Sequence, residues 1–279
     1  MKIINKEYVE KIVKMYNNGE QIPRRQQIFY KGIEHTLNSN VQYVMNNEEL
    51  REYTKCANDI IYFIEIHLGI KLRKYQKDWI LLYKENRFTI YNVARQTGFN
   101  TIFAAINLHD MIFNNKNILY IQTKYSSNYF DMIKSYYMKL QYFLKPGIII
   151  MNAKLIKFNN AKISVIKKNI DDYDIYEYNN FAFMKDKEIE EIYKKIIPNI
   201  AASKERKIII TSTPNGKNYF YNLYKNSSIT KDQNPNKNCY KSIQTYWWEV
   251  EGRDLKWKEE EIKRLGSEDA FNREHDLEF

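Results

Sequence analysis

Hydrophobic and polar positions follow a helical period in the first third of the chain. This pattern predicts a short amphipathic helix over residues 5–17 and two further helices over Glu48–Cys56 and Asp59–Leu68. Between them, Gln21–Asn40 has no clear periodicity and is predicted to be an arm or linker. The front of the chain is therefore predicted to be a helical subdomain.

The pattern then changes to short apolar runs that alternate with helices, starting with a helix over Arg73–Tyr83. The predicted strands are, in chain order, Phe88–Val93, Ile118–Gln122, Ile148–Ile150, a hairpin of Lys154–Phe158 and Lys162–Ile166, Asp174–Tyr178, Lys207–Thr211 and Ser242–Trp248. One predicted helix follows Phe88–Val93 and ends near Asn114. The others cover Ser127–Phe143, Lys187–Ile197 and Leu255–Leu265, and one more carries Tyr219, Phe220, Leu223 and Tyr224. This alternation is typical of an α/β fold with a mostly parallel sheet and helices on both faces.

The same pattern divides the chain into three parts. We predict an N-terminal helix and arm over 1–45, a small helical subdomain over 46–84, and an α/β core with a C-terminal helical segment over 85–279.

Composition adds a weak indication of the partner. The chain has 44 Lys and Arg against 34 Asp and Glu, a net charge of +10, which favours polyanions such as DNA. An equally good interpretation is that many of the lysines only solvate the surface. Cys56 and Cys239 lie far apart and indicate neither a disulfide framework nor a metal site, so a reducing compartment is expected. We find no signal peptide and no run of about 18 apolar residues, so no membrane association is expected.

The segment Arg87–Thr101, RFTIYNVARQTGFNT, has the form of a buried strand, a tight turn and the start of a helix. In an α/β protein this is where a phosphate loop of the form G-x-x-x-x-G-K-[ST] binds a nucleotide. Here Phe99, Asn100 and Thr101 follow Gly98, so the Lys that reaches the phosphates is absent.

Several segments, in a consistent order, resemble the ATPase domain of the large terminase subunit, the DNA-packaging motor of tailed phages, especially of the myovirus type. They include YTKCANDIIYFI at 53–64, FAF at 181–183, IIITSTPNGKNYFY at 208–221 and the C-terminal stretch at 252–279. The resemblance implies a P-loop NTPase-like fold.

The resemblance also implies roles for single residues. Gln76 would contact adenine, and Arg95, with Gln96, would stabilise charge in the transition state. Gly98 and Thr101 would belong to the phosphate loop. The coupling motif, which links hydrolysis to DNA movement, would be Thr211, Ser212 and Thr213.

The chain departs from this family at the positions that carry the chemistry. Phe99 replaces the phosphate-loop Lys, and its ring is expected to occupy space intended for phosphate oxygens; Asn100 replaces the first hydroxyl residue, although Thr101 could serve for Mg²⁺. Asn179 and Asn180 stand where the family has Asp and Glu. An amide has the shape of a carboxylate but neither its charge nor its basicity. A shortened loop at Lys167–Tyr173 and Glu177 within an apolar strand are further departures.

These replacements are consistent with one another electrostatically. In a site that binds no nucleotide and no Mg²⁺, the family's Lys, Asp and Glu would be unpaired charges, which cost stability. Phe and Asn at these positions remove that cost. We therefore predict a catalytically degenerate domain, a pseudo-ATPase of viral origin, with no catalytic residues, no metal and no cofactor. One alternative is an active packaging motor with an unorthodox site that uses ATP and Mg²⁺. Another is a basic nucleic-acid-binding module without nucleotide.

The chain is expected to lack the nuclease half of the family. Its expected partners are double-stranded DNA and phage assembly proteins, namely portal, capsid or active terminase subunits. The expected location is the cytoplasm of an infected host cell or the virion.

Overall fold

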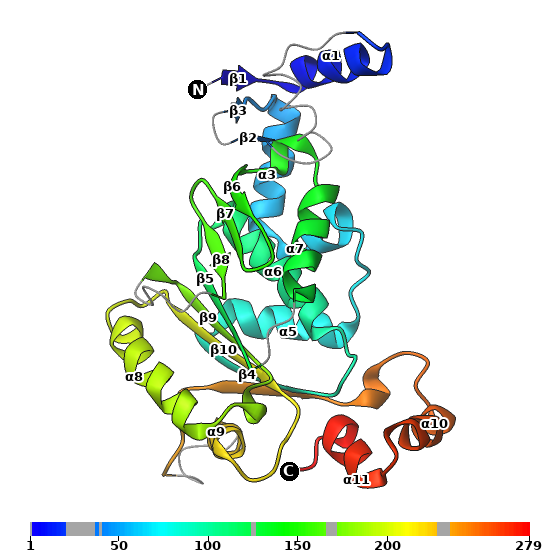
Figure 1. The fold of residues 1–279 in the computed structure, drawn as a ribbon, viewed down its shortest axis with the longest axis vertical. Helices are drawn as coiled ribbons and strands as arrows, with labels where there is room; N and C mark the ends of the chain where they lie inside the picture. The colour runs from blue at the N-terminus through cyan, green and yellow to red at the C-terminus, as the bar shows by residue number, and fades with distance from the viewer. Residues whose placement is uncertain (1, 21–36, 39–40, 124–126, 166–171, 228–234) are drawn as a thin grey trace. The chain divides into compact units, whose positions relative to one another are not determined.

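The computed structural model describes residues 2–20, 37–38, 41–123, 127–165, 172–227 and 235–279 (Figure 1). They form two compact units. Unit 1 comprises Met1–Leu72, Asn100–Asn117 and Ser126–Ile166; unit 2 comprises Arg73–Phe99, Ile118–Tyr125 and Lys167–Phe279. Most of the predicted arm and most of the shortened loop lie outside the described residues. The three-part division drawn from the sequence stays a prediction.

Unit 1 combines helices with two small groups of strands. Its helical elements are α1 (Lys6–Asn17), α3 (Asn47–Asn58), α4 (Ile60–Tyr62), a π-helix η1 (Phe63–His67), α6 (Phe99–Phe113, from its second residue), α7 (Asn128–Lys139) and a 3-10 turn η2 (Tyr142–Leu144). Strand β1 (Lys2–Ile4) pairs parallel with β3 (Val41–Tyr43). Strand β2 (Leu37–Asn38) pairs parallel with β6 (Gly147–Met151), and β6 continues antiparallel into β7 (Leu155–Phe158) and β8 (Lys162–Ser164).

Helix α7 ends earlier than the predicted Ser127–Phe143. Its last residue is Lys139, and Leu140 has an extended backbone. The side chain of Lys145 returns to donate a hydrogen bond to the carbonyl of Met138, at 3.0 Å. A Lys at a helix C-terminus satisfies an unpaired carbonyl and so favours ending the helix there.

Unit 2 is built on five parallel strands in the order β11-β4-β10-β9-β5. Their bounds are β4 (Phe88–Val93), β5 (Ile118–Gln122), β9 (Ile175–Asn179), β10 (Lys207–Ser212) and β11 (Lys241–Thr245). The helical elements of this unit are α5 (Lys74–Glu85), η4 (Phe181–Phe183), α8 (Asp186–Ala201), α9 (Tyr219–Ser227), η5 (Trp247–Glu249), α10 (Leu255–Leu265), α11 (Glu268–Phe271) and η6 (Asn272–Asp276).

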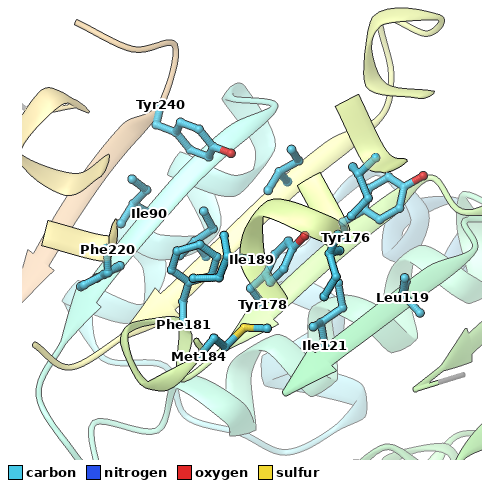
Figure 2. Close-up of a cluster of buried hydrophobic side chains, with 14 of the residues drawn as sticks. Ile90, Leu119, Ile121, Tyr176, Tyr178, Phe181, Met184, Ile189, Phe220 and Tyr240 are labelled. Carbon is cyan, nitrogen blue, oxygen red and sulfur yellow. The ribbon is translucent and has the colours of Figure 1, made fainter. Parts of the chain in front are cut away.

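The two faces of this sheet are covered by different helices of unit 2. On one face Ile90, Ile210 and Tyr178 belong to a buried cluster with Ile189 of α8 and Phe220 of α9 (Figure 2). Side chains alternate between the faces of a strand, so residues such as Tyr91 lie on the other face. There α5 packs on the sheet, and the Tyr91 hydroxyl donates to the carbonyl of Trp79 at 3.2 Å. The predicted α/β fold, with a mostly parallel sheet and helices on both faces, is confirmed.

The last strand is shorter than the predicted Ser242–Trp248. It ends at Thr245 and is followed by the 3-10 turn η5. The indole Nε1 of Trp247 donates to Asp276 Oδ1 at 2.7 Å, and its ring stacks on Trp257 with ring centres 5.4 Å apart. These contacts with the C-terminal segment turn the chain out of the sheet.

None of the helices in the described part of the chain combines the length and the hydrophobicity needed to cross a bilayer.

Candidate phosphate-loop site

The predicted phosphate loop joins β4 to α6 through Ala94–Gly98. The Ala94 N–H donates to the carbonyl of Thr245 at 2.8 Å, which extends the pairing of β4 with β11 by one residue. Gln96 and Gly98 have positive φ values, 60° and 88°. Asn100 and Thr101 follow in the first turn of α6. The strand, turn and helix predicted for this segment are therefore present.

Two side chains of α5 hold the loop through the carbonyl of Thr97. The Tyr75 hydroxyl donates to it at 2.9 Å and the Gln76 amide at 3.1 Å. The other end of the Gln76 amide accepts a hydrogen bond from the Arg73 N–H at 3.0 Å. A Cβ on Gly98 would lie 2.9 Å from Gln76 Nε2. Gln76, the predicted adenine contact, is thus bound to the loop and buried against it.

Phe99 does not occupy the space predicted for it. Its side chain is buried, with its ring centre 5.6 Å from that of Trp79 on α5 and 5.2 Å from that of Tyr91 on β4. Trp79 is itself fixed by its indole N–H, which donates to Thr245 Oγ1 at 2.9 Å. The expectation that this ring fills the phosphate position was wrong, because a large apolar ring is more stable in the core between α5 and β4.

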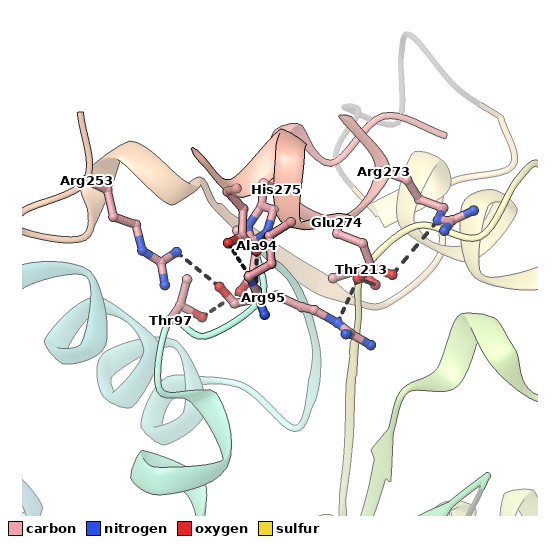
Figure 3. Close-up of polar contacts among 10 residues, drawn as sticks. Ala94, Arg95, Thr97, Thr213, Arg253, Arg273, Glu274 and His275 are labelled. Atoms are coloured by element: carbon pink, nitrogen blue, oxygen red, sulfur yellow. Dashed lines mark hydrogen bonds and ion pairs between the residues drawn. The ribbon is translucent and has the colours of Figure 1, made fainter. Parts of the chain in front are cut away.

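Arg95 is paired with an acid from the end of the chain (Figure 3). Its Nε lies 2.9 Å from Glu274 Oε2, and its N–H donates to the Glu274 carbonyl at 3.0 Å. The same carboxylate oxygen accepts a hydrogen bond from Thr213 Oγ1 at 3.2 Å. Glu274 thereby connects the loop to the predicted coupling motif, while 62% of the Arg95 side chain remains exposed.

A second cation contacts the loop from the outside. The Arg253 guanidinium donates to the carbonyls of Arg95 and Gln96, both at 3.1 Å, and it lies 4.4 Å from the centre of the Trp257 ring. Burial lowers the pKa of Arg253, but its ordinary pKa is so high that it stays charged at neutral pH.

The other predicted site residues lie at the carboxyl ends of the neighbouring strands. Strand β10 lies between β4 and β9, and Tyr91, Thr211 and Asn179 are register neighbours across them. They therefore share the face on which α5 packs. Ser212 points to the opposite face, where its Oγ accepts a hydrogen bond from the Ala182 N–H at 3.0 Å. Asn180 is exposed in a left-handed conformation that starts η4.

Burial raises the pKa of Tyr75, which contacts the loop, and of Tyr91, which contacts Phe99. The negative charge of Glu177 contributes to the shift of Tyr91. A tyrosine hydroxyl is protonated at neutral pH even at its ordinary pKa, and burial moves both further from ionisation, so both act as hydrogen-bond donors. Neither is suited to accept a proton from water.

These side chains do not fit a magnesium nucleotide. The residue in the lysine position is buried between two aromatic rings, and the amide of Gln76 is bound at both ends. Asn179 and Asn180 supply amides where a Mg²⁺ site requires carboxylate charge.

The sequence did not point to Glu274, Arg253 or Tyr75 as parts of this site. Glu274 and Arg253 approach from the C-terminal segment, where no local pattern indicates a contact with the loop. Tyr75 precedes Gln76, and that adjacency was the one available signal.

The order of the strands and the loop after β4 give unit 2 a P-loop NTPase-like α/β fold. No protein-family model matches the sequence. Solved structures do match. The ATPase domain of the large terminase of Thermus phage P74-26 is 15% identical, with a TM-score of 0.58, over 78% of this chain and 98% of that domain.

The large terminase of bacteriophage HK97 is likewise 15% identical, with a TM-score of 0.59, over 79% of this chain and 54% of that protein. A large terminase from a thermophilic bacteriophage, solved in complex with ATP-γ-S, is 11% identical, with a TM-score of 0.50, over 75% of this chain and 53% of that one. The chain therefore has the fold of a phage large-terminase ATPase domain, and it spans about half the length of these two terminases.

Proposed function

We propose that the chain is a catalytically degenerate terminase-like ATPase domain, which serves genome packaging as a structural, regulatory or binding component. The observation that carries this proposal is the position of Phe99 in the core, between Trp79 and Tyr91. A lysine side chain in this direction would point away from the phosphates and would bury its charge. An apolar ring at this position instead packs in the core.

Two further features support the same proposal. Gln76 is engaged by the loop that would otherwise receive the base, and Asn179 and Asn180 offer no general base. The fold has been kept, while the charges that act on a nucleotide have been replaced.

Measuring ATP turnover by the purified chain, with Mg²⁺ and double-stranded DNA, tests the proposal. We expect no turnover above that of an Arg95→Ala variant prepared in the same way, which serves as the blank for contaminating ATPases. DNA-stimulated hydrolysis that disappears in Arg95→Ala would contradict the proposal.

Nucleotide binding is a separate question from turnover. A ligand at a hundredfold excess over its Kd stabilises the folded state by about 2.7 kcal/mol. We expect ATP with Mg²⁺ to leave the melting temperature unchanged, because the amide of Gln76 and the ring of Phe99 are already committed to the protein.

The second candidate is an active motor with an unorthodox site, and the contact of Arg253 with the loop favours it. Arg253 would then supply positive charge in place of the missing lysine. Under this alternative, ATP raises the melting temperature of the wild type and Arg253→Ala abolishes that shift. If ATP changes the melting temperature of neither the wild type nor Arg253→Ala, the result supports the degenerate domain.

The partners follow from the net charge of +10 and from the fold. We propose double-stranded DNA, or an assembly protein such as portal, capsid or an active terminase subunit. DNA affinity that falls steeply with salt would favour DNA, since lysines and arginines release counterions from the phosphates. If the chain does not bind DNA at low salt, the assembly proteins are the expected partners.

A further inference from the structure

Unit 1 brings together a glutamate, a cysteine and a histidine that the sequence analysis did not connect. One ligand atom each from Glu52, Cys56 and His67 lies within 4.8 Å of the other two. We propose that these three residues form a zinc-binding site that opens onto a cavity of unit 1. This inference is independent of the function proposed for the loop, and it runs against the expectation of a protein without metal.

Helix α3 positions the first two ligands. Its N-terminus is fixed by a capping box in which Asn46 Oδ1 accepts from the Glu49 N–H, and the Glu49 carboxylate accepts from the Asn46 N–H, both at 2.9 Å. Glu52 and Cys56 are four residues apart on this helix, so they lie on the same face, one turn apart. A well-formed helix thus presents a carboxylate and a thiol side by side.

The third ligand comes from an unusual turn. After α4 the chain forms the π-helix η1, in which the Leu68 N–H donates to the carbonyl of Phe63 at 3.3 Å. A π-helical turn is a rare conformation that frequently occurs at functional sites. The last residue of this turn is His67. Its ring stacks on that of Phe63, with ring centres 6.3 Å apart. Its Nε2 lies 2.8 Å from Glu52 Oε1.

The donor set selects the kind of metal. A thiolate, an imidazole and a carboxylate are the ligands that Zn²⁺ takes, whereas Mg²⁺ and Ca²⁺ prefer oxygen alone. Zinc–ligand distances of about 2.0–2.3 Å place tetrahedral ligands roughly 3.3–3.8 Å apart, so small side-chain movements suffice. The Tyr62 hydroxyl donates to Glu52 Oε1 at 2.7 Å and orients the carboxylate, as hydrogen-bonding neighbours of metal ligands commonly do.

The cavity supplies access and the fourth position. It has a volume of about 990 Å³, and Glu52, Tyr62 and His67 line it together with residues of α1 and η2. Cys56 is not among the lining residues and is fully buried. Three protein ligands with an open position toward a cavity is the arrangement in which Zn²⁺ keeps a water or another ligand.

The competing explanation is a plain hydrogen-bonded cluster of Glu52, Tyr62 and His67, beside a cysteine that only fills space. The two explanations differ in the thiol, because a metal requires the Cys56 sulfur as a ligand and the cluster does not. Co²⁺, which takes the place of Zn²⁺ and absorbs visible light, separates them.

The experiment is a titration of the full chain with Co²⁺. We expect saturation at one ion per chain, with a thiolate-to-cobalt absorption band and the strong visible bands of a tetrahedral site. Cys56→Ser should lose the thiolate band, while Cys239→Ser, which removes the other cysteine, an exposed one in unit 2, should keep it. A wild type without the thiolate band, or a band lost only in Cys239→Ser, overturns the proposal.

A measurement on the wild type alone covers the case in which Cys56→Ser fails to fold. X-ray absorption of the chain loaded with one equivalent of Zn²⁺ should show one sulfur at about 2.3 Å and nitrogen or oxygen neighbours at about 2.0 Å. A first shell of nitrogen and oxygen only, or zinc that is lost on dialysis, overturns the proposal.

Discussion

Replacing Gly98 by alanine tests whether the close contact between Gln76 and the loop stabilises the protein. Gly98 has φ +88°, a left-handed conformation that costs an L-residue about 1–2 kcal/mol. The new Cβ would also lie 2.9 Å from Gln76 Nε2. The Gln76 amide is the end of a flexible side chain and can move, but moving it breaks its hydrogen bonds to Thr97 and Arg73.

Each of these two bonds contributes about 1 kcal/mol. Gly98→Ala should therefore lower the free energy of unfolding by about 3–4 kcal/mol. The matched control is Gly252→Ala, because Gly252 has φ +84° but no atom within 4 Å of the added Cβ. That variant should lose only the backbone contribution of about 1–2 kcal/mol.

Urea denaturation followed by tryptophan fluorescence is the assay. All four tryptophans, at positions 79, 247, 248 and 257, belong to unit 2, so the signal reports on the unit that contains the loop. In a Gln76→Ala background the steric conflict is gone, and Gly98→Ala should cost no more than Gly252→Ala. Equal losses for the two glycine variants in the wild-type background would refute the reasoning.

The remaining predictions concern the core and the C-terminal segment. Phe99→Ala should lower the free energy of unfolding in urea by about 3–5 kcal/mol, as expected for a buried ring. The control Phe183→Ala, at a residue that is 39% exposed, should lower it by less than about 1 kcal/mol. Similar losses in the two variants would place the Phe99 ring outside the core. Glu274→Gln should lower the free energy of unfolding by about 1 kcal/mol or less at low salt and by still less at high salt, because its partner Arg95 is largely exposed. A loss that does not depend on salt would mean that the ion pair does not contribute. Burial lowers the pKa of His275, against the opposing effect of its neighbour Glu261. The unfolded chain then binds more protons, so the free energy of unfolding should fall as the pH drops below about 6.5, and His275→Gln should flatten this dependence; an unchanged profile would contradict it.

The fold could be predicted from the sequence because its elements are defined locally. The strands Phe88–Val93 and Ile118–Gln122 were predicted with the bounds they have in the structure. Each is a short, mostly apolar run, and such runs pack in the centre of a parallel sheet. Errors occurred at the front of the chain, where β1 and β3 pair in a part predicted to be helical, and at element ends. Trp247 was assigned to a strand that ends at Thr245, and Phe143 to a helix that ends at Lys139. Contacts with other segments compete with local preference at both places.

Part of the candidate site was also visible in the sequence. The glycine of the loop, the absence of lysine after it and the amides at 179 and 180 are all statements about residue identity. The direction of the Phe99 ring was not predictable, because it depends on the space between α5 and β4, which only the packed structure defines.

What the sequence determined by itself was the succession of strands and helices in the α/β core, the position of the loop after β4 and the residue types in that loop. What only the tertiary structure decided was which residues meet there and elsewhere. Glu274 contacts Arg95 from the C-terminal segment, and a π-helical turn brings His67 to Glu52 and Cys56. The physical reason is that periodicity records burial within one element, whereas such contacts depend on how separate elements pack.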